Sequence, residues 1–259
     1  MGEGTGMGAT TRRDFLTVLG AAAGGAIAAP LLAQGAGQSG SARPPDAKKS
    51  SATPRPSEFV FARLRYDSGD WDYNPKVAGN ILDGVLQYTT IPVHEQEVVI
   101  SADSTEIDAF PFLFMTGHKL VRFSERERKG LARFVNNGGL LFSDDCNHDI
   151  NGLYAKSFEA EMQRAFPGTG TLAKVAKGHA IYRSLFQFDG PPRTTHEING
   201  WGDNIIHDYV RGIERRGRLG VVYTNQDYGC EWDYSWRNKR FRTKDNTKFG
   251  VNLVGYAMS

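Results

Sequence analysis

The sequence has little of three features that would by themselves narrow its function. Only two of its 259 residues are cysteines, so a framework of several disulfides cannot hold the domain together. Lysine and arginine number 31, and aspartate and glutamate number 29; such a balanced charge argues against a nucleic-acid partner. Outside the N-terminal segment, no apolar run approaches the roughly 20 residues of a membrane-spanning helix, so no stable membrane span is expected in the rest of the chain.

The N-terminal segment begins with a basic pair, Arg12-Arg13, followed by an apolar stretch at residues 15–29 and small residues up to Ala33. This order is typical of a secretory signal peptide, and the paired arginines indicate the twin-arginine type. We therefore expect residues 1–33 to direct export through the twin-arginine translocation machinery, with the protein periplasmic or otherwise exported. The alternative is an uncleaved membrane anchor, for which an apolar stretch of about 15 residues is short.

The remainder of the chain divides by composition. Residues 34–57 are rich in glycine, serine, alanine, proline and lysine, a composition that buries too little apolar surface to offset the entropy of ordering and predicts a flexible linker. Residues 58–259 have the length and apolar content of a single α/β domain with a sizeable core.

Apolar strands and amphipathic helices alternate along this domain. Residues 112–115 and 140–142 are apolar, and between them Ser124 and Glu127 have the spacing of a capping box at a helix start. Gly138 is expected to end that helix. The strand–helix–strand order predicts parallel strands joined by a right-handed crossover. Further strands are expected at residues 59–65, 98–100 and 219–223, and further helices from Pro75, over 158–166 and over 249–257.

Together these elements predict an α/β fold with an open, mostly parallel sheet and helices on both faces. Other segments have a weaker pattern. Residues 172–175 and 181–182 are expected to be short extended pieces, and residues 193–201 an excursion or a hairpin. The arginine-rich residues 211–218 are interpreted as the solvated end of a helix rather than as a binding patch.

Polar and aromatic residues follow each of the main strands except the short second one. Because ligands bind at the carboxyl ends of the strands in open α/β sheets, we expect a ligand site at this edge. Its aromatic rings could stack on a sugar, or they could fold back into a satellite core. The candidate ligand-binding residues are Asp70, Trp71, Thr116, Gly117, His118, Asp144, Asp145, Asp227, Tyr228, Glu231 and Trp232.

The densest polar cluster is residues 144–149, directly after the fourth strand. Its carboxylates and imidazole could hold a divalent metal, for which Asp144, His148 and Asp149 are the candidate ligands. The same residue types also cap helices and form turns. Adjacent residues of a strand point in opposite directions, so Asp144 and Asp145 could not both face one ion without a bend.

Cys146 and Cys230 both lie at strand ends and are candidates for a disulfide in an exported protein. A nucleophilic role for Cys146 is a further alternative, although no Gly-x-Cys-x-Gly elbow surrounds it. His118 and Asp145 are the candidates for a general base.

Several of these segments resemble a known family. They are FVFARLRY (59–66), FPFLFMTGH (110–118), GGLLFSDDC (138–146), NQDYGCEW (225–232) and GVNLVGYA (250–257). In order along the chain, they resemble the bacterial domain of unknown function numbered 4159. The resemblance implies a flavodoxin-like fold similar to class I glutamine amidotransferases. A working amidotransferase would need a nucleophile elbow with cysteine and a His–Glu pair; this sequence lacks that pattern, so glutaminase activity is not expected.

From these observations we expect an exported protein that binds a small polar or carbohydrate-like ligand, or an envelope protein partner, at the strand-end loops. The alternative is a hydrolase of a glycan or an ester, with His118 or Asp145 as general base. The sequence identifies no cofactor, although the acidic cluster would suit a divalent metal. A structural subunit of an envelope complex, with the loops as its docking face, is a third interpretation.

Overall fold

A computed structural model describes residues 54, 57–198, 206–233 and 245–259 of the chain. The expected signal peptide and almost all of the expected linker lie outside the described residues, so their prediction stands as the sequence leaves it. Part of the segment at 193–201 also lies outside them.

The described residues form a seven-stranded sheet with the strand order β2-β1-β3-β4-β7-β6-β5. The strands from β2 to β7 in this order are parallel, and β6 and β5 are antiparallel to their neighbours. This confirms the α/β, flavodoxin-like prediction of an open, mostly parallel sheet. The strands are β1 (Ala62–Arg65), β2 (Val98–Ser101), β3 (Phe112–Gly117), β4 (Leu140–Asp145), β5 (Ala173–Lys174), β6 (Arg211–Arg215) and β7 (Arg218–Thr224).

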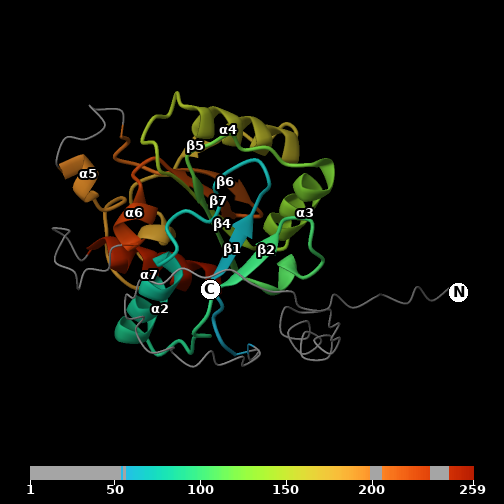
Figure 1. Ribbon diagram of the computed structural model, residues 1–259. Helices are drawn as coiled ribbons and strands as arrows, with labels where there is room; N and C mark the ends of the chain where they lie inside the picture. Colours follow the sequence, from blue (N-terminus) through green and yellow to red (C-terminus); the bar gives the residue numbers. More distant parts are fainter. Residues whose placement is uncertain (1–53, 55–56, 199–205, 234–244) are drawn as a thin grey trace, which may run out of the picture. The chain divides into compact units, whose positions relative to one another are not determined.

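Helices cover both faces of the sheet, as Figure 1 shows. On one face α2 (Val77–Tyr88) packs against α6 (Tyr228–Asp233) and α7 (Asp245–Met258), and on the other α3 (Glu125–Asn136) packs against α4 (Leu153–Ala165). None of the helices in the described part of the chain is long and apolar enough to cross a membrane. The short helix α5 (Thr195–Ile198) and the 3₁₀ helices η1 (Ile107–Ala109) and η2 (Ala180–Tyr182) lie in connections.

The central strands β3 and β4 are buried along their whole length. Phe114 and Phe142 belong to the core shared with α2 and α7. Leu113 and Leu141, the neighbours that point the other way, are equally buried. Burial on both faces explains why these strands are continuous apolar runs rather than alternating patterns.

The helix α3 has the predicted start and end. The Ser124 side chain accepts a hydrogen bond from the Glu127 backbone N–H, and the Glu127 side chain accepts one from the Ser124 backbone N–H. Gly138, just past the helix, has a φ of 86°, the left-handed conformation that glycine adopts most easily. The capping box and the glycine stop are therefore confirmed.

The structure corrects two of the weaker predictions. Residues 181–182 are not extended but belong to η2, whose first turn is capped by the His179 ring. The arginine-rich stretch is not a helix end: it forms β6 and a tight hairpin through Arg216 and Gly217, both with positive φ, into β7.

The strand order fixes where a ligand can approach. The chain passes from β1 to β2 on one side and then returns to β3 on the other side of β1. The connections after β1 and β3 therefore diverge to opposite sides of the sheet, which makes the carboxyl ends of these two strands a topological switch point, where open α/β sheets bind ligands.

Candidate functional site

The loop after β1 is held by a buried arginine. Arg63 is 1% exposed and donates hydrogen bonds to the carbonyls of Trp71 (3.4 Å), Tyr73 (3.0 Å) and Asn74 (3.0 Å). Its Nε lies 2.9 Å from the Glu97 carboxylate. Sequence reasoning missed this role, although a charge inside an otherwise apolar strand is the signal that could have found it.

Asp70 in this loop contacts His118 at the end of β3. Asp70 Oδ2 lies 2.9 Å from His118 Nδ1, and Asp70 Oδ1 accepts hydrogen bonds from the backbone N–H of His118 (2.9 Å) and Lys119 (3.3 Å). Burial acts to raise the pKa of Asp70, but the hydrogen bonds and charge of His118 outweigh it and lower that pKa. The two residues thus form an acid–base pair across the switch point.

The two ring nitrogens of His118 differ, because Nδ1 faces Asp70 and Nε2 does not. An ionised carboxylate only accepts hydrogen bonds, so Nδ1 carries the proton that faces Asp70. Nε2 makes no hydrogen bond to any residue that the structure describes. Because the side chain is 31% exposed, this nitrogen can reach a bound molecule.

The close approach of Asp70 requires a glycine at position 117. A Cβ on Gly117 would lie 2.4 Å from the Tyr66 hydroxyl oxygen and 2.7 Å from Asp70 Oδ1. The Tyr66 hydroxyl donates to the Thr116 carbonyl at 2.9 Å. Gly117 was expected to bind ligand; it instead makes room for the carboxylate that orients His118.

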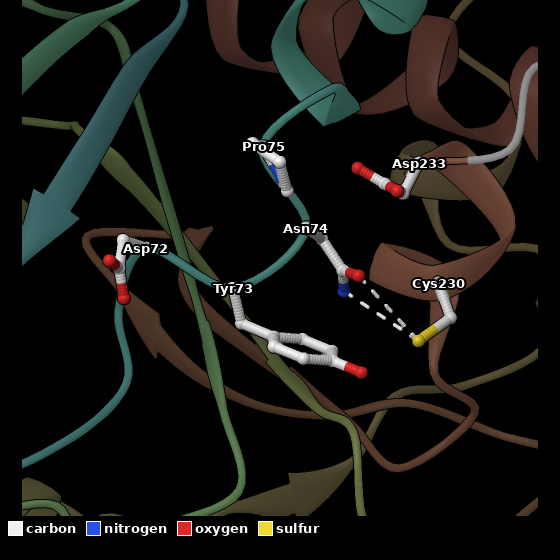
Figure 2. A pocket seen from close by; sticks show the side chains of 6 residues that line it. All are labelled: Asp72, Tyr73, Asn74, Pro75, Cys230 and Asp233. Atoms are coloured by element: carbon white, nitrogen blue, oxygen red, sulfur yellow. Dashed lines mark hydrogen bonds between the residues drawn. The ribbon is translucent and has the colours of Figure 1, made fainter. Parts of the chain in front are cut away.

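Tyr73 joins this pair to a cavity. Its ring lies edge-on to the His118 ring at 4.3 Å between centroids, and its side chain is 42% exposed. In Figure 2, Asn74 and Cys230 point toward each other across the cavity, whereas Asp72 lies apart from them. The cavity has a volume of about 360 Å³ and is lined by Asp72, Tyr73, Asn74, Pro75, Cys230 and Asp233.

The two adjacent aspartates of β4 are fully buried and make different contacts. Asp144 accepts hydrogen bonds from the backbone N–H of Tyr228 (3.1 Å) and Gly229 (2.6 Å) at the start of α6. Asp145 accepts from the Tyr223 hydroxyl and the Asn147 N–H, both at 2.9 Å. Asp144 caps the start of α6, and Asp145 links the end of β4 to Tyr223 of β7. Capping of this kind was the alternative interpretation of the cluster.

Burial shifts both carboxyl groups toward the neutral form. Burial and the charge of Asp227 raise the pKa of Asp144, and its two N–H donors oppose the shift. Burial raises the pKa of Asp145 to about 6 against the hydrogen bonds from Asn147 and Tyr223. Neither group is exposed, so Asp145 cannot reach a substrate as a general base in this conformation.

The two cysteines lie together at this edge as free thiols. One potential ligand atom each from Cys146, Asp227 and Cys230 lies within 4.8 Å of the other two. The hydrogen bond to the Cys230 thiol, burial and the charge of Asp227 raise the pKa of Cys146. The disulfide stays a prediction, and the structure supplies the proximity that it would need.

The metal ligands expected from sequence do not form a group of ligands among the described residues. Asp144 is taken by backbone amides, and Asp149 Oδ1 accepts from the Asn151 N–H at 2.8 Å in a turn. His148 Nε2 instead lies 3.5 Å from Asp227 Oδ2. The group of potential ligand atoms in the described residues is instead Cys146, Asp227 and Cys230.

Comparison with known proteins identifies a family, and the description of that family names no reaction. A family model described as "Domain of unknown function (DUF4159)" matches residues 60–258. The chain belongs to this family. No curated protein matches the sequence.

Three expected ligand-binding residues of this DUF4159 domain are buried in its fold. Trp232 packs against Phe142 and Tyr228, each at 5.4 Å between ring centroids, and its Nε1 donates to the Asn246 carbonyl at 2.8 Å. The Tyr228 hydroxyl donates to the Pro192 carbonyl, and a carboxylate oxygen of Glu231 accepts from the Thr195 N–H. The rings of Tyr228 and Trp232 belong to the core shared with α2 and α7 rather than to a sugar-stacking platform.

The DUF4159 site therefore has two chemically different parts. One is the accessible Asp70–His118 pair beside the cavity, which can accept a proton from a bound molecule. The other is the sulfur-rich group formed by Cys146, Asp227 and Cys230, which suits a soft or borderline cation. Tyr73 and Asn74, consecutive in the loop held by Arg63, lead from one part to the other.

Proposed function

We propose that this DUF4159 protein is an exported hydrolase of a small polar ester, with His118 as the general base. The observation that carries the proposal is the Asp70–His118 pair at 2.9 Å, placed at the switch point with Nε2 turned away from Asp70. An acid–base pair oriented in this way at the ligand-binding edge of a sheet identifies a candidate catalytic site. The resemblance supplies no reaction, so the proposal depends on this geometry alone.

The chemistry follows from the fixed tautomer. His118 Nε2 takes a proton from water while the water oxygen attacks the ester carbonyl. Asp70 stabilises the imidazolium that forms, because its carboxylate accepts the Nδ1–H throughout. The same imidazolium then returns the proton to the departing alkoxide, so the free enzyme is regenerated and the products are an acid and an alcohol.

An ester fits this site better than a glycan. Glycoside hydrolysis in most families needs two carboxyl groups that flank the scissile bond. Asp145 is fully buried and Asp70 is occupied by three hydrogen bonds, so neither is placed for that task. Tyr73, exposed beside the His118 ring, offers an aromatic wall for the alcohol or acyl part of the substrate.

The binding function expected first from the sequence has less support. It needed a pocket lined by Trp71 and Trp232 without an acid–base pair. Trp232 is only 3% exposed, and the acid–base pair is present at the same edge of the sheet.

Hydrolysis of p-nitrophenyl acetate by the purified chain tests the proposal. We expect the wild type to cleave this ester and His118→Ala to lose about 100-fold or more of kcat/KM. Asp70→Asn should lose part of the rate, because an amide cannot stabilise the imidazolium. Asp67→Asn, an exposed carboxylate in the same loop, is the matched control and should keep the full rate. A wild-type rate no higher than that of His118→Ala would overturn the proposal.

A further inference from the structure

We propose that Cys146, Asp227 and Cys230 form a zinc site beside the cavity of Figure 2, which Cys230 lines. The inference stands apart from the ester hydrolase, because it concerns different side chains and is tested by metal binding. It also differs from the metal ligands expected from the sequence, of which none belongs to this group.

The three ligands come from two neighbouring strand ends. Cys146 directly follows β4, and Asp227 and Cys230 follow β7, which is the parallel neighbour of β4. Backbone hydrogen bonding between these strands sets the spacing of the two loops. Cys230 N donates to Asp227 Oδ1 at 3.3 Å, so these two ligands are also fixed relative to each other.

The spacing of the ligand atoms is close to that of a tetrahedral site. Zn–S bonds of about 2.3 Å and Zn–O bonds of about 2.0–2.2 Å place tetrahedral ligand atoms roughly 3.7 Å apart. Here the three atoms lie within 4.8 Å of one another. Side-chain rotations that draw them together by at most about 1 Å would complete the geometry.

A shell of polar groups surrounds each ligand, as metal sites require. The Asn74 amide nitrogen lies 3.6 Å from the Cys146 sulfur and 3.7 Å from the Cys230 sulfur, where its N–H groups can stabilise thiolates. Thr116 Oγ1 lies 3.0 Å from the Cys146 sulfur. His148 Nε2 lies 3.5 Å from Asp227 Oδ2, placed to orient that carboxylate.

The cavity gives access to one of the three ligands. Cys230 and Asn74 line the cavity, whereas Cys146 and Asp227 are buried. This arrangement gives an ion a route of entry. Two thiolates with one carboxylate favour zinc over magnesium or calcium, which prefer sites made of oxygen alone.

The test uses reduced full-length protein that has been freed of metal with a chelator. Zinc added in competition with a chromophoric chelator should bind at one ion per chain. Cobalt in its place should give a thiolate-to-cobalt charge-transfer absorption in the near ultraviolet. Absence of zinc uptake, or a cobalt spectrum without that absorption, would overturn the proposal, and neither readout on the wild type depends on a variant that folds.

Variants then locate the site. Cys230→Ser should weaken zinc binding by about 100-fold or more. Loss of a side chain that only hydrogen-bonds to a metal ligand costs about 10–100-fold in affinity, and loss of a direct ligand should cost at least as much. Asp72→Asn, at the same cavity but apart from the sulfurs, and Asp149→Asn, one of the ligands expected from the sequence, should bind zinc as the wild type does. Unchanged binding by a folded Cys230→Ser would place the ion elsewhere and refute the assignment.

Discussion

One buried side chain determines the conformation of the loop that carries Asp70 and Tyr73. The guanidinium of Arg63 donates to three backbone carbonyls of that loop and pairs with Glu97. Its planar fork of five N–H donors reaches three separate carbonyls and a carboxylate at once, whereas a lysine offers three donors at a single nitrogen. Arg63 therefore contributes both to the stability of the fold and to the geometry of the site.

Removing that guanidinium should be costly. Arg63→Met leaves the Trp71, Tyr73 and Asn74 carbonyls without their donor, and we expect a loss of about 3–5 kcal/mol in the free energy of unfolding by urea. Arg65→Met, in the same strand but exposed, is the control and should cost less than about 1 kcal/mol. Equal losses in the two variants would show that the loop does not depend on Arg63.

The elements that the sequence predicts correctly are those with local signals. The helix α3 has its capping box, apolar stripe and terminal glycine within its own segment. The strands β3 and β4 are runs of apolar residues that nothing but burial on both faces explains. For these, neighbouring residues contain the information and no distant contact is needed.

The elements that were missed depend on partners far away in the sequence. The short helix α6 begins where the Asp144 carboxylate, on β4, accepts the N–H groups of Tyr228 and Gly229. The strand β6 looks too charged for a sheet, but Arg211 pairs with Glu159 of α4 at 2.6 Å and Arg215 lies over the Phe166 ring. No pattern within those segments indicates such contacts.

The packing of α3 against α4 includes a buried charge with a testable pH dependence. Glu161 of α4 is 1% exposed and pairs with Arg128 of α3 at 2.6 Å and with Arg164 at 2.7 Å. Burial acts to raise the pKa of Glu161, but the two arginines outweigh it and lower that pKa below the ordinary 4.5. A lowered pKa means that the ionised pair stabilises the fold above that value and that the contribution is lost as the pH falls below it.

Glu161→Gln should therefore destabilise the protein in a pH-dependent way. At about pH 7 the variant keeps the shape but loses the charge, and we expect a loss of about 1–3 kcal/mol in the free energy of unfolding. The difference from the wild type should shrink as the pH falls below 4.5 and through the lowered pKa of Glu161, because the wild-type carboxylate becomes protonated there. Urea unfolding across this range measures it, and a gap that stays constant with pH would rule out the charge as its cause.

The order of the strands in the whole sheet explains how far the site could be predicted. The candidates were chosen because they follow strands, and the switch point between β1 and β3 does lie at that edge. Asp70 and His118 meet there, as expected of a site at strand ends. Thr116, Asp144 and Asp145 are fully buried instead. Sequence order shows which residues follow a strand but not whether a side chain turns toward solvent or toward a neighbouring loop.

The expected route of export bears on the state of the two thiols. A twin-arginine signal in residues 1–33 would carry the chain across the membrane already folded, after folding in the reducing cytoplasm. Zinc could then occupy the thiols before the protein meets an oxidising compartment. A chain that crosses unfolded would meet oxidants first, and Cys146 and Cys230, close together in the fold, would be free to join as a disulfide.

The two routes should therefore yield different proteins from the periplasm of one Gram-negative host. We expect the native signal to yield protein with zinc and both thiols intact, and a signal for the general secretory route to yield the disulfide without zinc. Thiol counting under denaturing conditions and metal analysis of both products measure this. An Arg12→Lys, Arg13→Lys double variant is the control, and it should remain in the cytoplasm with its zinc.

Equal export of that variant would refute the twin-arginine assignment. Identical thiol and zinc content from both routes would refute the link between folding before export and metal loading.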